Sequence, residues 1–225
     1  MMRCVLLDTE TTGLDPLLGH RVIEIAAIEL QNDLPSAAFF HRFVNPHRPV
    51  PAEATAINGI ADADLAEAPD FASIAPELLG FLGNDPIIAH NAPFDFSFLD
   101  AEFSRIDIPL LDRARMIDSL ALAKQRFPGL PNSLDALCRR FAIDLSERST
   151  HNALLDCRLL AAVYLELTGG RQRGLALVRA APSRAPDMVE HSNHVPRLIV
   201  PTEAERARHA AFLARLKGKP LWLNG

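Results

Sequence analysis

The sequence is poor in cysteine, has no long apolar run and has few basic residues in its first three quarters. Its three cysteines, Cys4, Cys138 and Cys157, are odd in number and widely spaced, so they favour neither a disulfide framework nor a zinc site. We expect buried free thiols. No stretch of about 18 or more apolar residues is present, which argues against a membrane-spanning helix. The charge of Asp8 comes too early for a signal peptide, so we expect a soluble, cytoplasmic protein with no membrane partner.

Basic residues are scarce up to residue 170 and common after it. Residues 1–170 hold 13 Lys/Arg against 24 Asp/Glu, net -11, whereas residues 171–225 hold 10 against 4, net +6. Nonspecific affinity for nucleic acid comes from Lys and Arg that neutralise phosphates, so the acidic part is not expected to wrap a duplex. It can still contain a site where carboxylates hold divalent cations, because such cations supply the positive charge that a phosphodiester needs where it is cut.

The order of apolar patterns predicts the fold class. The length of 225 residues and the hydrophobic content of 48% predict one α/β domain with extra segments. Strands come first and are followed by strand–helix alternation, which predicts a mixed sheet flanked by helices. Strands are expected at 4–7, 22–30, 39–44 and 86–90, and helices at 71–82, 93–103, 118–126, 133–141 and 153–168.

The composition changes after Gly170. Prolines among small and polar residues at 181–196 are typical of a linker without its own core. Residues 197–200 fit a strand and 202–216 an amphipathic helix, with Thr202 and Glu205 as a capping box. This last segment is too short to form an independent core, so we expect it to dock on another surface.

Asp8 and Glu10 form the first motif, in the run Leu-Leu-Asp-Thr-Glu-Thr-Thr-Gly at 6–13. Side chains two residues apart on a strand project to the same side, so these carboxylates lie close together and repel each other. A divalent cation with oxygen ligands, such as Mg²⁺, relieves this repulsion. A solvated pair on an edge strand is the alternative.

Two further motifs place polar residues where an apolar helix begins. Asp95 follows the expected strand at 86–90 in the first turn of a helix, a position that the helix dipole alone also favours. His151 and Asp156 are about 140° apart on an ideal helix, so they face one site only if His151 lies on the preceding loop. A neutral histidine there could take a proton from water, or it could simply bond the backbone at the start of the helix.

Together the three motifs resemble those of a known family. Asp-Thr-Glu-Thr-Thr-Gly at 8–13, His-Asn-Ala-x-Phe-Asp at 90–95 and His-x-Ala-x-x-Asp at 151–156 are similar to the DEDDh exonucleases of the ribonuclease H-like superfamily. Longer stretches at 57–62, 132–138 and 163–170 resemble the epsilon proofreading subunits of bacterial DNA polymerase III. The resemblance is strong over residues 3–170 and weaker in the tail, although Leu221 and Trp222 match a terminal aromatic of that group.

The resemblance implies a fold, a reaction and a set of metal ligands. The fold would be a five-stranded mixed sheet with helices on both faces. Asp8, Glu10, Asp95 and Asp156 would bind two divalent cations, Mg²⁺ or Mn²⁺, with Asp8 shared between them. His151 would be the general base, and the products would be nucleoside 5′-monophosphates released from mispaired 3′ ends.

The resemblance also implies substrate contacts. Glu53 and Asn58 correspond to positions that contact the sugar and base of the terminal nucleotide, although the family commonly has a histidine where this chain has Asn58. Thr11 and Phe94 are expected beside the substrate; the alternatives are a turn hydroxyl and a core aromatic. A frayed or single-stranded DNA 3′ end is the expected ligand, since a mispaired terminus is easier to unstack.

Three chain segments and several partners follow from the same resemblance. Residues 1–170 would be the exonuclease domain, 171–196 a linker, and 197–225 a tail that binds the DNA polymerase III alpha subunit. Gln172, Leu175 and Leu177, within 172–177, have the spacing of a short peptide that binds a sliding clamp. A small accessory subunit could bind the exonuclease domain, and the location would be the replisome at the bacterial nucleoid.

Two other functions are compatible with the same motifs. A stand-alone nuclease for RNA or short oligonucleotide ends would use the same site, because no motif reports on the 2′ hydroxyl. A non-catalytic replisome adaptor would keep the fold alone. A linker with an apolar terminal segment favours a tethered subunit over a free nuclease. Five ionisable groups directed at one spot argue against an adaptor.

Overall fold

The computed structural model describes residues 3–146, 148, 150–169 and 200–215. The chain divides into two compact units, residues 1–175 and residues 176–225. Within the described ranges, no helix is long and apolar enough to span a membrane.

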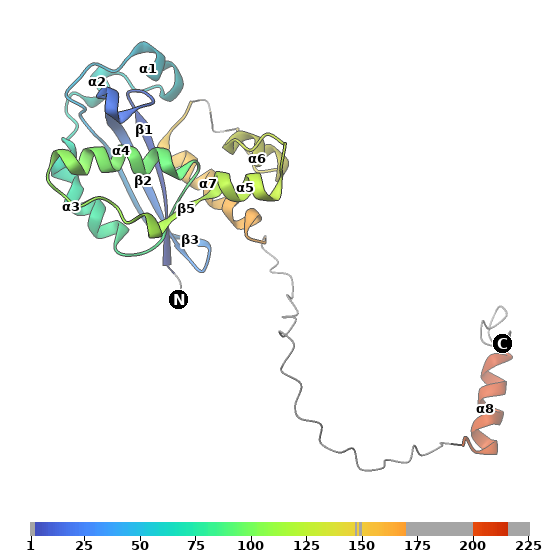
Figure 1. Ribbon diagram of the computed structural model, residues 1–225. Helices are drawn as coiled ribbons and strands as arrows, with labels where there is room; N and C mark the ends of the chain where they lie inside the picture. Colours follow the sequence, from blue (N-terminus) through green and yellow to red (C-terminus); the bar gives the residue numbers. More distant parts are fainter. Residues whose placement is uncertain (1–2, 147, 149, 170–199, 216–225) are drawn as a thin grey trace. The chain divides into compact units, whose positions relative to one another are not determined.

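The first unit is built on a five-stranded mixed sheet with the order β3-β2-β1-β4-β5 (Figure 1). Its strands are β1 (Arg3–Thr11), β2 (Val22–Gln31), β3 (Leu34–Phe43), β4 (Ile87–Ala89) and β5 (Met116–Asp118). The first three strands pair antiparallel, whereas β4 pairs parallel with both β1 and β5. The predicted mixed sheet with flanking helices is confirmed.

Helices cover both faces of the sheet, so the central strand β1 is apolar on both sides. Val5 and Leu7 pack into one core with α3 (Phe71–Leu82) and α4 (Ala92–Arg105). Cys4 and Leu6 pack into a second core on the opposite face. That core also contains residues of α5 (Ser119–Arg126), α6 (Leu134–Arg140) and α7 (Ala153–Leu167). The alternation of β1 therefore decides which helices each of its later side chains meets.

Local signals in the sequence explain where several helices begin. Ser133 caps α6 by accepting a hydrogen bond from the backbone N–H of Ala136. Asn152 caps α7 in the same way with the N–H of Leu155, at 3.0 Å. In the second unit, α8 (Glu203–Leu213) starts with the predicted capping box between Thr202 and Glu205. The three cysteines are free and buried, as predicted.

Several short elements were not expected from the sequence. The connector between β3 and α3 contains α1 (Ala52–Asn58) and α2 (Asp62–Leu65), and the 3-10 turns η1 (Pro16–Leu18) and η2 (Arg113–Arg115) lie in loops. Strand β5 was also missed. Elements of three to seven residues are too short to show a hydrophobic period.

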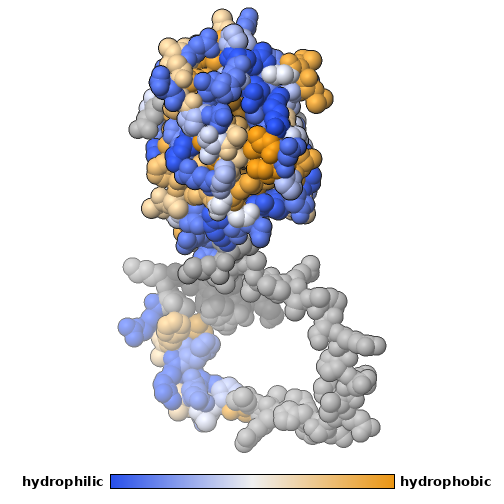
Figure 2. All heavy atoms as spheres, turned by 90° about the vertical axis from the view of Figure 1, so that its left-hand side faces the viewer, coloured by the Kyte–Doolittle hydropathy of each residue, from blue (hydrophilic) through white to orange (hydrophobic). Residues whose placement is uncertain are grey.

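The edge strand β3 begins at Leu34, whereas the sequence predicted a strand only from residue 39, because residues 34–38 do not alternate between apolar and polar side chains. Leu34 and Phe39 are 56% and 57% exposed. On the face of the molecule that Figure 2 shows, hydrophobic patches are interspersed with hydrophilic ones. The strand expected at 197–200 falls mainly outside the described residues, and Val200 is in no strand.

Candidate active site

Asp8 and Glu10 lie on the α7 side of the sheet. They alternate with Thr9 and Thr11, and they continue the face of β1 that carries Cys4 and Leu6. Both carboxylates are partly buried. The sequence prediction that they share one side of a strand is confirmed.

Asp95 approaches the same place from the first turn of α4. Its side chain is buried, and one carboxylate oxygen accepts a 2.8 Å hydrogen bond from the hydroxyl of Thr9. Asn91, which precedes the helix, has a φ of 71° in the left-handed region. Asp118, at the end of β5, holds this turn by accepting hydrogen bonds from the N–H groups of Asn91 and Ala92. The strained turn thereby sets the position of Asp95.

His151 lies on the loop before α7, and Asp156 lies in the first turn of that helix. The histidine is exposed and the aspartate is buried. Nδ1 of His151 is 3.3 Å from Oδ2 of Asp156. The prediction that these two side chains meet only if His151 precedes the helix is therefore confirmed.

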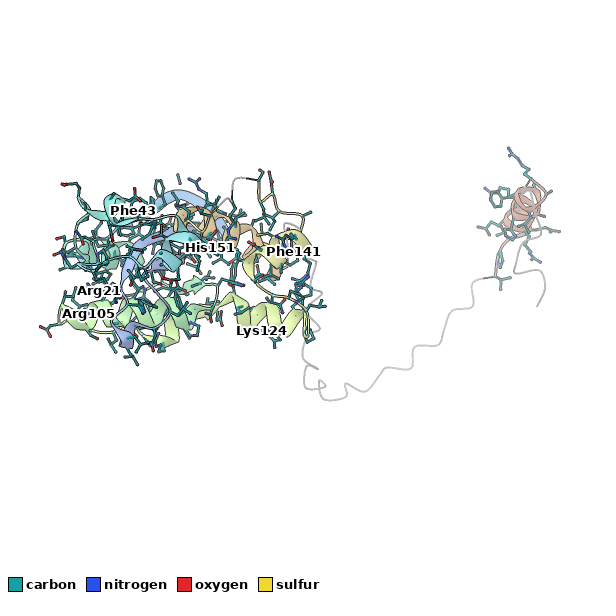
Figure 3. The ribbon with its side chains drawn as sticks, turned by 90° about the horizontal axis from the view of Figure 1, so that it is seen from above. Arg21, Phe43, Arg105, Lys124, Phe141 and His151 are labelled. Atoms are coloured by element: carbon teal, nitrogen blue, oxygen red, sulfur yellow. The ribbon has the colours of Figure 1, made fainter. Side chains whose placement is uncertain are left out.

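All five ionisable residues line one cavity of about 610 Å³. Candidate ligand atoms of Glu10, His151 and Asp156 lie within 4.8 Å of one another. His151, which precedes α7 in the chain, is labelled in Figure 3. Residues from β1, α4 and the start of α7, far apart in the sequence, thus converge on one place.

The protein supplies too little positive charge beside Asp8, Glu10 and Asp95 to balance their carboxylates. Burial, and then the negative charges of Asp95 and Glu10, raise the pKa of Asp8 well above its usual value. Burial raises the pKa of Glu10 to about 7, against the effect of His151. Burial also raises the pKa of Asp95 to about 7, although the Thr9 hydrogen bond opposes this. A hard divalent cation suits this site, because carboxylate oxygens are its preferred ligands and its charge would offset the excess of negative charge.

Arg148 is a member of the site that the sequence analysis missed. Its Nε donates to Oδ1 of Asp156 and its Nη2 to Oδ2, both at 2.6 Å. Nη1 pairs with Asp135, and Nη2 is 2.9 Å from Nδ1 of His151. Although burial alone would raise the pKa of Asp156, the hydrogen bonds from Arg148 and His151 outweigh it and lower the pKa. No motif or periodicity marks Arg148.

The expected substrate residues line the same cavity and also make structural contacts. Thr11, Glu53, Asn58 and Phe94 all face it. The Thr11 hydroxyl donates to the Gly13 carbonyl at 2.6 Å, and Asn58 accepts from the N–H of Ile60 at 2.9 Å. The Phe94 ring packs 4.9 Å from the ring of Phe98. Thr11, Asn58 and Phe94 therefore serve the fold and border the cavity at the same time.

A second cavity of about 990 Å³ adjoins the first at Asp8, His151 and Asp156. It extends over α5 and the segment 128–134. Among the described residues, Lys124 and Arg148 are the two basic side chains that line this second cavity. The first cavity is lined by no described Lys or Arg. Figure 3 shows Lys124 on α5.

The residues predicted to bind a sliding clamp, Gln172, Leu175 and Leu177, lie outside the described residues.

The fold and the converging acidic groups define a class. The mixed sheet is ribonuclease H-like, and its cavity is lined by carboxylates from β1, α4 and α7 and by a histidine ahead of α7. These features are those of a metal-dependent nuclease of the DEDDh type. The sequence model of the exonuclease family (RNase_T) matches residues 5–164.

The similarity to curated relatives shows which group of exonucleases the chain belongs to. The chain is 44% identical over 222 residues to DNA polymerase III subunit epsilon of Rickettsia conorii, with 96% of each chain covered. It is 38% identical over 243 residues to the epsilon subunit of Escherichia coli K12, covering 98% of this chain and 97% of that one. The chain therefore belongs to the exonuclease family, among the epsilon subunits of DNA polymerase III, and is a metal-dependent 3′-to-5′ proofreading exonuclease.

Solved structures agree with this assignment. Exonuclease X in complex with 5′-overhanging duplex DNA is 26% identical, with a TM-score of 0.60 over 74% of this chain and 91% of that one. The nuclease domain of 3′hExo, a DEDDh family member bound to rAMP, has a TM-score of 0.63 at 17% identity, again over 74% and 91%. The second likeness shows the shared fold.

Proposed function

We propose that the chain removes mispaired 3′-terminal nucleotides from DNA as 5′-monophosphates, by hydrolysis that depends on two divalent cations, Mg²⁺ or Mn²⁺. Asp8, Glu10, Asp95 and Asp156 would hold the cations, and His151 would be the general base. The observation that carries the proposal is the convergence of these five side chains on one cavity.

The cations, when bound, would supply positive charge to the scissile phosphate and lower the pKa of the attacking water, so that the water gives up its proton more easily. Asp8 and Glu10 are fixed by the register of β1, and Asp95 by Thr9, so their positions need little rearrangement. Rigid carboxylates lower the cost of assembling the site.

His151 takes the proton of the attacking water. It is exposed, lies on a loop and lines the cavity, so its imidazole is accessible to a water in the cavity. The hydrogen bond with Asp156 raises the pKa of His151, which strengthens the imidazole as a proton acceptor.

The terminal nucleotide would enter the cavity of about 610 Å³ beside Glu53, Asn58, Thr11 and Phe94. The strand upstream of it would lie in the adjoining cavity, where Lys124 offers positive charge to a phosphate. A mispaired end is less costly to unstack than a paired one, so fraying selects the substrate.

Residues 1–170 would act as the exonuclease, 171–196 as a linker and 197–225 as the contact to the DNA polymerase III alpha subunit, at the replisome on the nucleoid in the cytoplasm. The relatives named epsilon subunits support this arrangement. No residue of α8 is buried within its own unit, and Phe212 is 57% exposed, which leaves apolar surface for a partner. Residues 172–177 would bind a sliding clamp, and a small accessory subunit would bind residues 1–170.

The test is cleavage of a 5′-labelled primer whose 3′ end is paired or mismatched, by the full chain with Mg²⁺, with EDTA and as a His151→Ala variant. We expect a ladder that shortens from the 3′ end, runs faster on the mismatch and disappears with EDTA and in the variant. Equal rates on paired and mismatched ends would contradict proofreading. A parallel RNA primer tests a general nuclease, and loss of alpha-subunit binding on deletion of 197–225 tests the tail.

A further inference from the structure

Glu24 is a buried charge that the proposed reaction does not use. It is the third residue of β2, has no exposed surface and lies between the apolar residues Ile23 and Ile25. It is paired with Glu10 across the β1–β2 register, so its side chain lies beside Glu10 on the same face of the sheet as the active-site carboxylates. A buried carboxylate is costly unless its oxygens are hydrogen-bonded, so its partners indicate what it does.

The two carboxylate oxygens of Glu24 accept hydrogen bonds from three donors, which lie on β3 and at the start of α7. Oε1 is 2.7 Å from Nε2 of His41 on β3 and 3.0 Å from the side-chain amide nitrogen of Asn152. Oε2 accepts from the backbone N–H of Ala153 at 3.2 Å. One carboxylate therefore joins the sheet to the first residues of α7.

These contacts fall directly after His151. Asn152 donates to Glu24 with its amide nitrogen while its amide oxygen caps α7, so both ends of this side chain are fixed. On the other side, the N–H of His151 donates to the carbonyl of Ile57 at 3.1 Å. His151 is exposed, yet its backbone is held between α1 and the anchor at Glu24.

We propose that Glu24 is a positioning residue for His151: it fixes the turn before α7 and thereby aims the imidazole at the attacking water. The inference rests on the proposed role of His151 as general base. Glu24 is next to Glu10, but its hydrogen bonds to the start of α7 go to Asn152 and Ala153, and it acts on His151 through these two residues. In the sequence its signal is one glutamate inside the apolar stretch 22–28 of β2.

The experiment compares Glu24→Gln with the parent chain in single-turnover cleavage of a mismatched primer. A glutamine amide turns a donor toward the donors of Asn152 and Ala153, so at least one bond is lost. We expect the cleavage rate constant to fall roughly 10–100-fold, as for other residues that orient active-site ligands, with primer KM and Mn²⁺ affinity within about twofold. The imidazole nitrogen shifts of His151 in NMR spectra should change as well.

A double-mutant cycle separates positioning from general damage. Because Glu24 acts through His151, Glu24→Gln should cause no further loss in a His151→Ala background, measured with Mn²⁺ at high enzyme concentration. The same fold-loss in both backgrounds, or a loss confined to KM or Mn²⁺ affinity, overturns the inference. If His151→Ala alone keeps full activity, the general-base proposal fails instead.

Two variants complete the design. Glu29→Gln is the matched control, because Glu29 lies on the same strand but bonds Arg3 and Ser36, and its cleavage rate should be unchanged. Asn152→Ser keeps an N-cap for α7 and removes the amide donor to Glu24. It therefore tests the positioning role of Glu24 even if Glu24→Gln does not fold. It should lower the rate constant in the same direction, and an unchanged rate would overturn the inference.

Discussion

Arg148 holds both carboxylate oxygens of Asp156, with Nε 2.6 Å from Oδ1 and Nη2 2.6 Å from Oδ2. These are the oxygens that the proposed function assigns to a cation. The side chains of Arg148 and Asp156 are only 9% and 4% exposed, so the pair is well shielded from water. Arg148 thus balances the charge of Asp156 in the cation-free chain, and a cation must compete with it.

Arg148→Ala should lower the melting temperature in EDTA and increase the gain in melting temperature on adding Mn²⁺. Removing one partner of a buried ion pair costs up to about 3–5 kcal/mol, because the other charge is left unpaired. A cation then binds without displacing the arginine. Thermal unfolding of both chains in EDTA and over a Mn²⁺ titration measures the effect.

Arg126→Ala is the control for this prediction. Arg126 bonds the carbonyls of Glu166 and Leu167 at the far end of α7, so its removal should leave the Mn²⁺-dependent gain unchanged. An equal gain in the parent chain and in Arg148→Ala would show that Arg148 does not compete with the cation.

Asp8→Asn should abolish cleavage while making the cation-free chain more stable. The substitution keeps the shape of the side chain but removes a charge that burial and the nearby Asp95 and Glu10 make unfavourable. Activity and stability therefore change in opposite directions, as expected for a functional site. Primer cleavage and unfolding in EDTA are the two measurements, and retained cleavage would remove Asp8 from the proposed ligands.

The stability of the cation-free chain should fall as pH rises. Burial raises the pKa of Glu10 and of Asp95 to about 7 in the folded chain, against about 4 when unfolded. The folded state then binds more protons between these values, so its stability is lost as pH rises through about 7. From about pH 6 to about pH 8 the loss is about 1 kcal/mol per group, or about 2–4 °C in melting temperature each.

Melting curves in EDTA at several pH values check this sign. Asp95→Asn should show a shallower fall, because one of the two groups is gone. Saturating Mg²⁺ should reduce or reverse the fall, because cation binding requires the ionised carboxylates. A melting temperature in EDTA that is constant or rises over this range contradicts the assigned pKa directions.

The parts of the fold that follow a regular period could be predicted from the sequence. The helix expected at 71–82 coincides with α3, since its apolar residues recur at helical spacing and all face one core. The fixed period of two along β1 also sufficed to put Asp8 and Glu10 on one side. Strand β5 could not be found in this way, because three residues define no period.

The missed members of the site are those that act through tertiary contacts. Arg148 reaches Asp135 and Asp156 from a loop, and nothing in its neighbouring residues requires that conformation. Glu24 could have been noticed, since a buried carboxylate in an apolar stretch requires partners, but two of its three donors, Asn152 and Ala153, are more than a hundred residues away in the sequence. Such pairings follow from the packing of α7 on the sheet rather than from any local pattern.

Lys124→Ala should weaken the binding of long substrates and leave short ones unaffected. Lys124 lines the cavity that adjoins the catalytic groups, where the upstream strand is proposed to lie, and the terminal-nucleotide cavity has no Lys or Arg among its described residues. We expect a higher KM for a single strand of several nucleotides, an unchanged KM for a p-nitrophenyl ester of thymidine 5′-monophosphate, and a salt dependence of KM reduced by about one phosphate contact. Lys124→Arg should behave like the parent chain, because the charge is kept. An equal rise of KM for both substrates would show that Lys124 contacts the terminal nucleotide instead. An unchanged KM for both substrates would show that the upstream strand binds to a different surface.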